Sequence, residues 1–156
     1  MPELSASEYM ILAATIEYVE TLVPLFDAYR VFYNRSSDLN GARRFLLDRL
    51  QNQESVIYLA ARRDNGRGLG FVQLYPSFSS FSMRNIWVLS DLFVIPSARQ
   101  HGIARGLIEY AVQLAGDTGA SGLRLAAAVD NLAALKLFES LGWSREEGFY
   151  HYYLKV

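Results

Sequence analysis

Short stretches in which apolar residues run together or alternate with polar ones recur along the chain, each bounded by turn-forming residues. They are rich in β-branched and aromatic side chains, a composition typical of strands. Between the second and the third, the sequence DNGRG supplies two glycines for a tight turn, which predicts an antiparallel hairpin. The predicted strands are residues 9–14, 55–63, 69–76, 85–95, 123–129 and 149–156.

Apolar residues elsewhere recur at intervals of three and four, the spacing of one helix face. The first predicted helix is capped by Thr15 and kinked or divided at Pro24, because proline removes a hydrogen bond from a helix interior. The second is capped by Asp38 or Asn40. The predicted helices are residues 16–33, about 40–51, 102–117 and 131–141.

The order of these elements is β-α-α-β-β-β-α-β-α-β. A strand–helix–strand unit near the end requires a parallel pair joined by a right-handed crossover, whereas the earlier hairpins are antiparallel. The pattern therefore predicts an α+β fold with a single mixed β-sheet flanked by helices. A length of 156 residues favours one domain, residues 1–156.

Composition narrows the class of protein. The formal net charge of −1 gives no reason to expect nucleic acid or an anionic membrane as a partner. The absence of cysteine excludes disulfides, thiolate metal sites and a cysteine nucleophile. The first residues carry Glu3 and Glu8 and resemble neither a signal peptide nor a membrane span, so we expect a cytoplasmic protein.

The segment ARQHGIARGL, residues 98–107, joins the strand that ends at Pro96 to the third helix. The first amides of a helix lack intrahelical partners, and the helix dipole adds positive charge there. Gly102 lets an anion approach the backbone, and Arg99 and Arg105 add full charges. The segment predicts a phosphate or pyrophosphate cradle, with a plain surface loop as the alternative.

Two blocks resemble the motifs of the GNAT superfamily of acyl-CoA-dependent N-acyltransferases. LFVIPSARQHGIA matches a strand followed by Arg/Gln-x-x-Gly-x-Gly/Ala, and NLAALKLFESLGW matches Asn-x-x-Ala-x-x-Leu-Tyr-x-x-x-Gly-Phe. The order of elements also matches. The chain looks most like a branch with histone and polyamine acetyltransferases and uncharacterised bacterial members.

The resemblance implies that acetyl-CoA binds at the cradle. Its pyrophosphate would rest on the amides around Gly102, and its pantetheine would pair with the strand Leu92–Val94, in the gap beside the strand 123–129. Asn131 is implied as a second cofactor contact, besides capping its helix. The implied cofactor-binding residues are Leu92, Phe93, Val94, Arg99, Gln100, His101, Gly102, Ile103, Ala104, Arg105, Asn131 and Phe138.

Amine acylation requires a base, because a primary ammonium has a pKa of about 10. Asp91 interrupts an apolar strand beside the expected thioester and is the candidate. It could instead fix a strand bulge or bind the substrate ammonium. Phe138 stands where the family commonly has a tyrosine acid. The candidate replacements are Tyr75, Tyr150, Tyr152 and Tyr153, although packing is the more frequent role of such residues.

The acceptor would enter beside the first two helices, where aromatic side chains with Asp91 would suit a cationic amine such as a polyamine, an amino acid or a protein amine. The same aromatics could simply form core. Neither His101 nor His151 has the company of metal ligands, so no metal site is expected. The candidate substrate-binding residues are Phe32, Tyr33, Tyr75, Phe78, Trp87 and Asp91, with Tyr29 in the same lining.

The prediction is therefore an acetyl-CoA-dependent N-acetyltransferase that acts by direct attack of an amine, and a homodimer is compatible with the resemblance. Because Phe138 cannot donate a proton, an acetyl-CoA-binding module with little or no turnover is the alternative. A nucleotide-binding domain of another class is disfavoured, since the sequence has no Walker or Rossmann motif.

Overall fold

A computed structural model describes residues 4–156. Contacts between residues divide the chain into two compact units, one ending at Ala126 and the other comprising Ala127–Val156. The first unit holds a sheet and most of the helices, and the second holds one helix. The elements of the first unit are β1 (Tyr9–Ala13), a 3-10 turn (Ile16–Tyr18), α1 (Val19–Phe32), α2 (Leu39–Gln51), β2 (Val56–Arg62), β3 (Gly68–Ser79), β4 (Arg84–Val94), a second 3-10 turn (Pro96–Ala98), α3 (Ile103–Asp117) and β5 (Leu123–Leu125).

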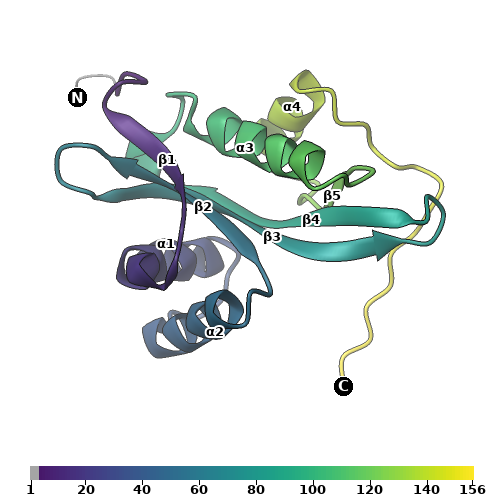
Figure 1. The fold of residues 1–156 in the computed structure, drawn as a ribbon, viewed down its shortest axis with the longest axis horizontal. Coiled ribbons are helices and arrows are strands. Elements are labelled where there is room, and N and C mark those ends of the chain that lie inside the picture. Colours follow the sequence, from purple (N-terminus) through teal and green to yellow (C-terminus); the bar gives the residue numbers. More distant parts are fainter. Residues whose placement is uncertain (1–3) are drawn as a thin grey trace. The chain divides into compact units, whose positions relative to one another are not determined.

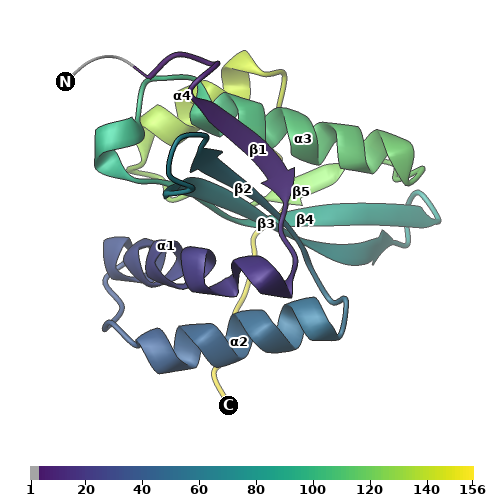
Figure 2. The same cartoon turned by 60° about the vertical axis from the view of Figure 1, so that its left-hand side comes forward.

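The five strands form one mixed sheet in the order β1-β2-β3-β4-β5. The first three pairings are antiparallel, and β4 pairs with β5 in parallel through α3, as the strand–helix–strand pattern predicts. Helices α1 and α2 cover one face of this sheet and α3 covers the other (Figures 1 and 2). The predicted α+β class and single mixed sheet are confirmed.

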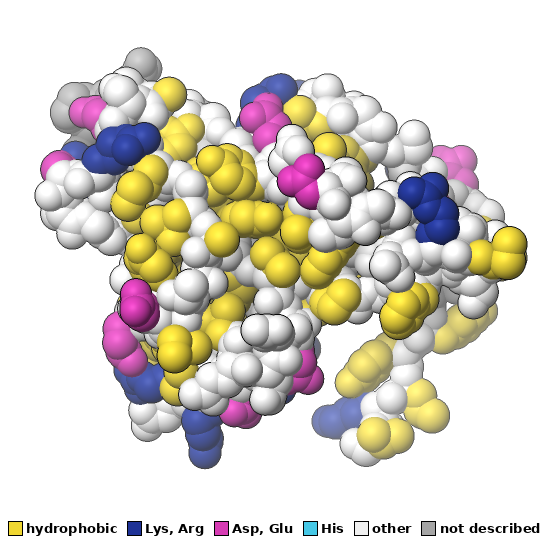
Figure 3. Space-filling view, viewed as in Figure 1, with side chains coloured by type: hydrophobic (Ala, Val, Ile, Leu, Met, Phe, Trp, Pro, Cys, Tyr) yellow, Lys and Arg dark blue, Asp and Glu magenta, His cyan; other side chains and the backbone are white. Residues whose placement is uncertain are grey.

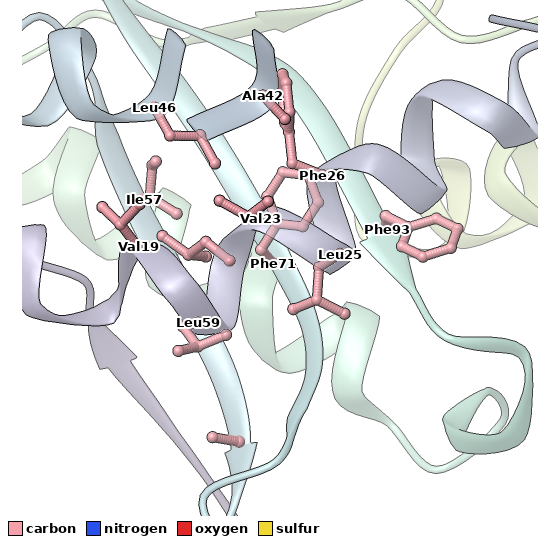
Figure 4. Packing of buried hydrophobic residues seen from close by; sticks show 12 residues of the cluster. Val19, Val23, Leu25, Phe26, Ala42, Leu46, Ile57, Leu59, Phe71 and Phe93 are labelled. Atoms are coloured by element: carbon pink, nitrogen blue, oxygen red, sulfur yellow. The ribbon is translucent and has the colours of Figure 1, made fainter. Parts of the chain in front are cut away.

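The main core lies between the sheet and the pair α1 and α2 (Figure 4). Phe26 of α1 stacks on Phe45 of α2 with ring centroids 5.6 Å apart, and Phe71 of β3 meets Phe26 at 6.1 Å. Leu46 and Leu59 are wholly buried. Apolar residues at helical spacing on α1 and α2, and at alternate positions on the strands, thus converge on one layer.

Two expectations about the first helix are wrong. Pro24 does not divide it: α1 runs through Pro24, and the change from 3-10 to α-helix occurs earlier, at Val19. Pro24 lies on the exposed side, where only one helical hydrogen bond is forgone. Thr15 makes no side-chain capping bond. For the second helix, the predicted cap is confirmed as Asp38, whose Oδ1 accepts a hydrogen bond from the amide of Gly41 at 2.9 Å.

Two predicted strands also differ from the structure. β5 covers Leu123–Leu125 only, rather than residues 123–129. Residues 149–156, predicted as the last strand, have no regular structure, and their side chains are exposed. Alternation alone does not make a strand, because each strand needs a neighbour to receive its backbone hydrogen bonds.

The second unit is described by itself. Its helix, α4 (Leu132–Ser140), begins after Asn131, whose Oδ1 accepts from the amide of Ala134 at 3.3 Å. Gly142 follows the helix end with a φ of 90°, the left-handed conformation that glycine adopts at no steric cost. Both ends of this helix are as predicted. Across the helices of residues 4–156, none is long and apolar enough to cross a membrane.

Candidate active site

The loop between β4 and α3 presents a run of unpaired backbone amides. Gln100 has a φ of 65° and Gly102, the residue before α3, a φ of 81°. Amides that follow such left-handed residues at a helix start point outward together. Within residues 4–156, no acceptor binds the amides from Gln100 to Arg105, whereas the amide of Gly106 already bonds to the carbonyl of Gly102 at 3.0 Å.

The space beside Gly102 is open. A Cβ built on Gly102 would meet no atom within 4 Å. Ile103 is 1% exposed and anchors the helix start in the core, whereas Arg105 is exposed. The loop therefore has what a diphosphate requires: clustered N–H donors, open space and positive charge. The residues present fit the pyrophosphate of acetyl-CoA.

The pairing of β4 with β5 ends short of Leu92. The parallel ladder joins Trp87–Leu89 to Leu123–Leu125 and goes no further, while β4 continues to Val94. On its other side, β4 stays paired with β3 as far as Val94, where Gly70 allows a close approach: a Cβ there would lie 2.6 Å from the carbonyl oxygen of Phe93. Leu92–Val94 thus have a strand neighbour on one side only within the first unit.

Asp91 lies on the face of β4 that α1 covers, and it is 8% exposed. Its register partner is Gln73 of β3, a wholly buried residue whose Nε2 donates to Asp91 Oδ2 at 2.8 Å. Burial raises the pKa of Asp91, and hydrogen bonds from Gln73, Tyr29 and Ser90 offset part of that rise. A carboxyl held in this way has a pKa closer to neutrality than an exposed aspartate.

The register of the strands changes next to Asp91. Gln73 faces Asp91, but the next residue of β3, Leu74, faces Leu89, so Ser90 has no partner of its own. This is a β-bulge, at the position where a bulge-fixing role was one alternative for Asp91. The structure has the bulge, and Asp91 beside it faces the buried side-chain amide of Gln73.

Two tyrosines surround the Asp91 carboxylate. Burial and the negative charge of Asp91 raise the pKa of Tyr29, on α1, far above its ordinary value, and the hydrogen bond between them adds to the rise. Burial, with a smaller contribution from Asp91, raises the pKa of Tyr75 to about 12. Both phenols therefore keep their protons at neutral pH and can donate hydrogen bonds.

The structure brings together some of the predicted acceptor residues and separates others. Phe32 and Tyr33 end α1 with their rings 5.1 Å apart, and Tyr33 meets Tyr29 at 5.2 Å. Trp87 does not join this group: its Nε1 donates to Thr118 Oγ1 at 2.9 Å, on the face that α3 covers. Phe78 shares that face and is 82% exposed.

Other predicted residues lie outside the arrangement around Asp91. His101 is half-buried and follows Gln100 in the amide loop. Tyr150 is 91% exposed and belongs to the segment that forms no strand. Asn131 and Phe138 belong to the second unit, where the Phe138 and Trp143 rings are 5.6 Å apart. Their roles at the cofactor remain predictions.

Sequence reasoning missed Gln73. It interrupts the apolar run LGFVQLYP as Asp91 interrupts its own strand. A buried amide costs free energy unless it is hydrogen-bonded, so the same reasoning that singled out Asp91 could have found it. Its Oε1 has no hydrogen-bond partner among the described residues.

The structure thus combines an α+β fold with free amides at the start of α3 and a buried carboxyl on β4, the strand that precedes this helix. The chain belongs to the acetyltransferase (GNAT) family, whose model matches residues 22–143, and it is an acetyl-transferring enzyme. It is 47% identical over 135 residues to YhfO of Bacillus subtilis, named an uncharacterized N-acetyltransferase; the match covers 86% of this chain and 89% of that protein.

Solved structures agree with this assignment. A crystal structure of a probable acetyltransferase superposes with a TM-score of 0.88 at 43% identity and covers 94% of this chain and 97% of that one. An aminoglycoside N-acetyltransferase solved in complex with CoA has the same fold, with a TM-score of 0.80 at 19% identity, covering 100% of this chain and 99% of that one.

Proposed function

We propose that this enzyme transfers the acetyl group of acetyl-CoA to a primary amine by direct attack. The observation that carries the proposal is the run of free amides from Gln100 to Arg105 with open space above Gly102. GNAT acetyltransferases act on amines with acetyl-CoA as donor, and the likeness in fold to a CoA complex supports the same donor here. Acetyl-CoA supplies the activated acyl group.

The diphosphate would be held by the amides from Gln100 to Arg105, with Arg105 adding positive charge. Leu92–Val94 would receive the pantetheine, because their backbone has no strand neighbour on the β5 side. An edge of this kind accepts an extended amide chain as it would accept another strand. Both parts of the cofactor thus have donors and acceptors of the right kind within the first unit.

Asp91 would take the proton of the acceptor ammonium. Its buried position raises its pKa, which makes it a stronger base than an exposed carboxylate. Gln73 holds one carboxylate oxygen at 2.8 Å. Tyr29 and Tyr75, kept protonated by their raised pKa values, would donate hydrogen bonds to a departing thiolate, whose proton would come from the attacking amine through Asp91. Tyr75 was predicted to protonate the thiolate, which its raised pKa disfavours, and Tyr29 was predicted only to line the acceptor site.

Charge is mixed on one face of the molecule. On the face drawn in Figure 3, Lys and Arg are interspersed with Asp and Glu, and apolar side chains lie between them. This face offers no field of one sign that would steer a cationic amine. The acceptor is therefore proposed to be recognised locally, by Asp91 and the aromatic end of α1.

The test is an acceptor panel of spermidine, amino acids and basic peptides, each mixed with acetyl-CoA and enzyme and followed by release of free thiol. We expect thiol to rise with at least one amine and the acetylated amine to appear in equal amount. Thiol release that is the same with and without any amine would refute the proposal.

A further inference from the structure

The side chain of Arg99 is fixed in place on the α1 side of the sheet. Its Nε donates to the carbonyl oxygen of Val94 at 2.8 Å. Its guanidinium carbon lies 5.5 Å from the ring centroid of Phe32 and 5.6 Å from that of Phe93. Stacking on the two rings and the Nε bond together set the plane of the guanidinium.

This position leaves the outer edge of the guanidinium free. Arg43 and Arg62 each place Nε and Nη2 on both oxygens of a carboxylate, Glu20 and Asp64 respectively. Arg99 does not: within residues 4–156, its Nη1 and Nη2 have no hydrogen bond and no acidic partner. Two parallel N–H groups on a fixed plane match the two oxygens of a carboxylate.

Arg99 and Asp91 lie along the same surface. Asp91 and Phe93 are two residues apart on one face of β4, a rise of about 7 Å, and the guanidinium stands 5.6 Å from the Phe93 ring. Tyr29 bridges them, with its ring 6.4 Å from Phe93 and its hydroxyl at Asp91. A negative group at Asp91 and a positive group over Phe93 therefore lie on one face, at positions about 7 Å apart along β4.

We propose that Arg99 selects the acceptor: its free guanidinium edge binds a carboxylate at one end of an aliphatic chain whose other end presents the amine to Asp91. The substrate class is thus an ω-amino carboxylate, such as an amino acid acetylated on its side-chain amine. An α-amine is too close to its own carboxylate to reach both groups. A polyamine would set a second positive charge against Arg99. This inference rests on the proposed function.

The test compares three matched acceptors: lysine, lysinamide and cadaverine, which is lysine without its carboxylate. For the unaltered enzyme we expect kcat/KM for lysine to exceed that for the other two by about tenfold or more, since a charge-assisted pair is lost. In Arg99→Gln the lysine-to-lysinamide ratio should fall to about one, and in Arg99→Lys it should be partly restored. Arg105→Gln, the other arginine of the loop, should keep the ratio.

Each contrary result has a distinct meaning. If the unaltered enzyme acetylates cadaverine or lysinamide as well as lysine, the inference fails and the proposed function stands. If Arg99→Gln weakens CoA binding but leaves the ratio unchanged, Arg99 serves the diphosphate and the inference fails. If no amine is acetylated, the proposed function fails, and binding of lysine and cadaverine measured by calorimetry decides the inference alone. Preference for lysine that is lost in Arg99→Gln supports the inference. Equal binding of the two, or no binding, overturns the inference.

Discussion

Replacing Gly102 with aspartate should abolish tight CoA binding without unfolding the protein. The space around the new Cβ is empty, so the side chain meets no atom of the protein. The left-handed backbone, with a φ of 81°, costs an L-residue about 1–2 kcal/mol. A carboxylate at a helix start returns about 0.3–1 kcal/mol. The free energy of unfolding should therefore fall by no more than roughly 2 kcal/mol, well within the 5–15 kcal/mol of an ordinary domain.

The expected cost to CoA binding is much larger. The new carboxylate would cover amides between Gln100 and Arg105 and would repel the diphosphate. A hydrogen bond to a charged group contributes about 1.5–3 kcal/mol. Losing two such bonds costs about 3–6 kcal/mol, which raises Kd by roughly 10²–10⁴-fold.

Titration calorimetry of CoA, with pantetheine as a ligand that lacks the diphosphate, measures this effect. The matched control is Gly119→Asp, since Gly119 has a φ of 69° and open space at the other end of α3. It carries the same backbone strain and the same charge far from the amides. The reasoning is refuted if the two variants bind CoA equally, or if Gly102→Asp weakens pantetheine as much as CoA.

Three further predictions concern buried polar groups. Asp91→Asn should reduce kcat far more than it changes CoA affinity. Because folding raises the pKa of Asp91, its charge costs stability at pH 7, and the variant should be more stable than the unaltered protein there. Thermal unfolding should show this gain in stability fading as the pH falls toward 4. Gln73→Met removes a hydrogen bond that lowers the pKa of Asp91, so the acidic limb of the kcat/KM profile should move to higher pH. Asp27→Asn weakens the acceptor of Ser37 Oγ and the Asp38 amide, each at 2.7 Å, and should cost about 1–3 kcal/mol in urea unfolding.

Each of these has a result that would contradict it. For Asp91→Asn it is full turnover at every pH, which would make the residue structural. Leu74→Met, the neighbouring wholly buried position on the other sheet face, is the control for Gln73→Met; an equal displacement of the limb in both would point to packing rather than hydrogen bonding. Unchanged urea unfolding in Asp27→Asn would show that the α1–α2 loop is held by other contacts, such as the Arg30 bond to the Ser36 carbonyl at 2.9 Å.

The fold was predictable where local chemistry decides the outcome. Gly102 and Asn131 mark helix starts because their roles there depend only on adjacent residues. The partners of Asp91 were not predictable. The pairing with Gln73 depends on the strand register, and that register changes at the bulge, which no periodicity reveals. The face of Trp87 was misjudged for the same reason.

In the final segment, a clear sequence pattern predicts a strand that the structure does not contain. Residues 149–156 alternate well and are rich in tyrosine, yet they form no strand in the structure. β-propensity measures how well a side chain fits a half-buried pleated surface, and it has no meaning before a neighbouring strand is present. The short β5 illustrates the same dependence, since its pairing with β4 ends at Leu125.

The unpaired Ser90 divides β4 into two parts whose alternation of faces is out of step. On one side of it, Ile86 and Leu89 are buried; on the other, Asp91 and Phe93 face α1. Removing this single residue would restore uniform alternation and keep Leu89 and Asp91 on the opposite faces that they already occupy, because their partners Leu74 and Gln73 are themselves adjacent. Straightening the strand with Ser90 still in place would instead compel one half of it to turn over, which would expel either the carboxyl from its pocket or the leucine from its own. Loss of one residue should therefore be tolerated at Ser90, whereas loss of Leu92 would turn one part of the strand over.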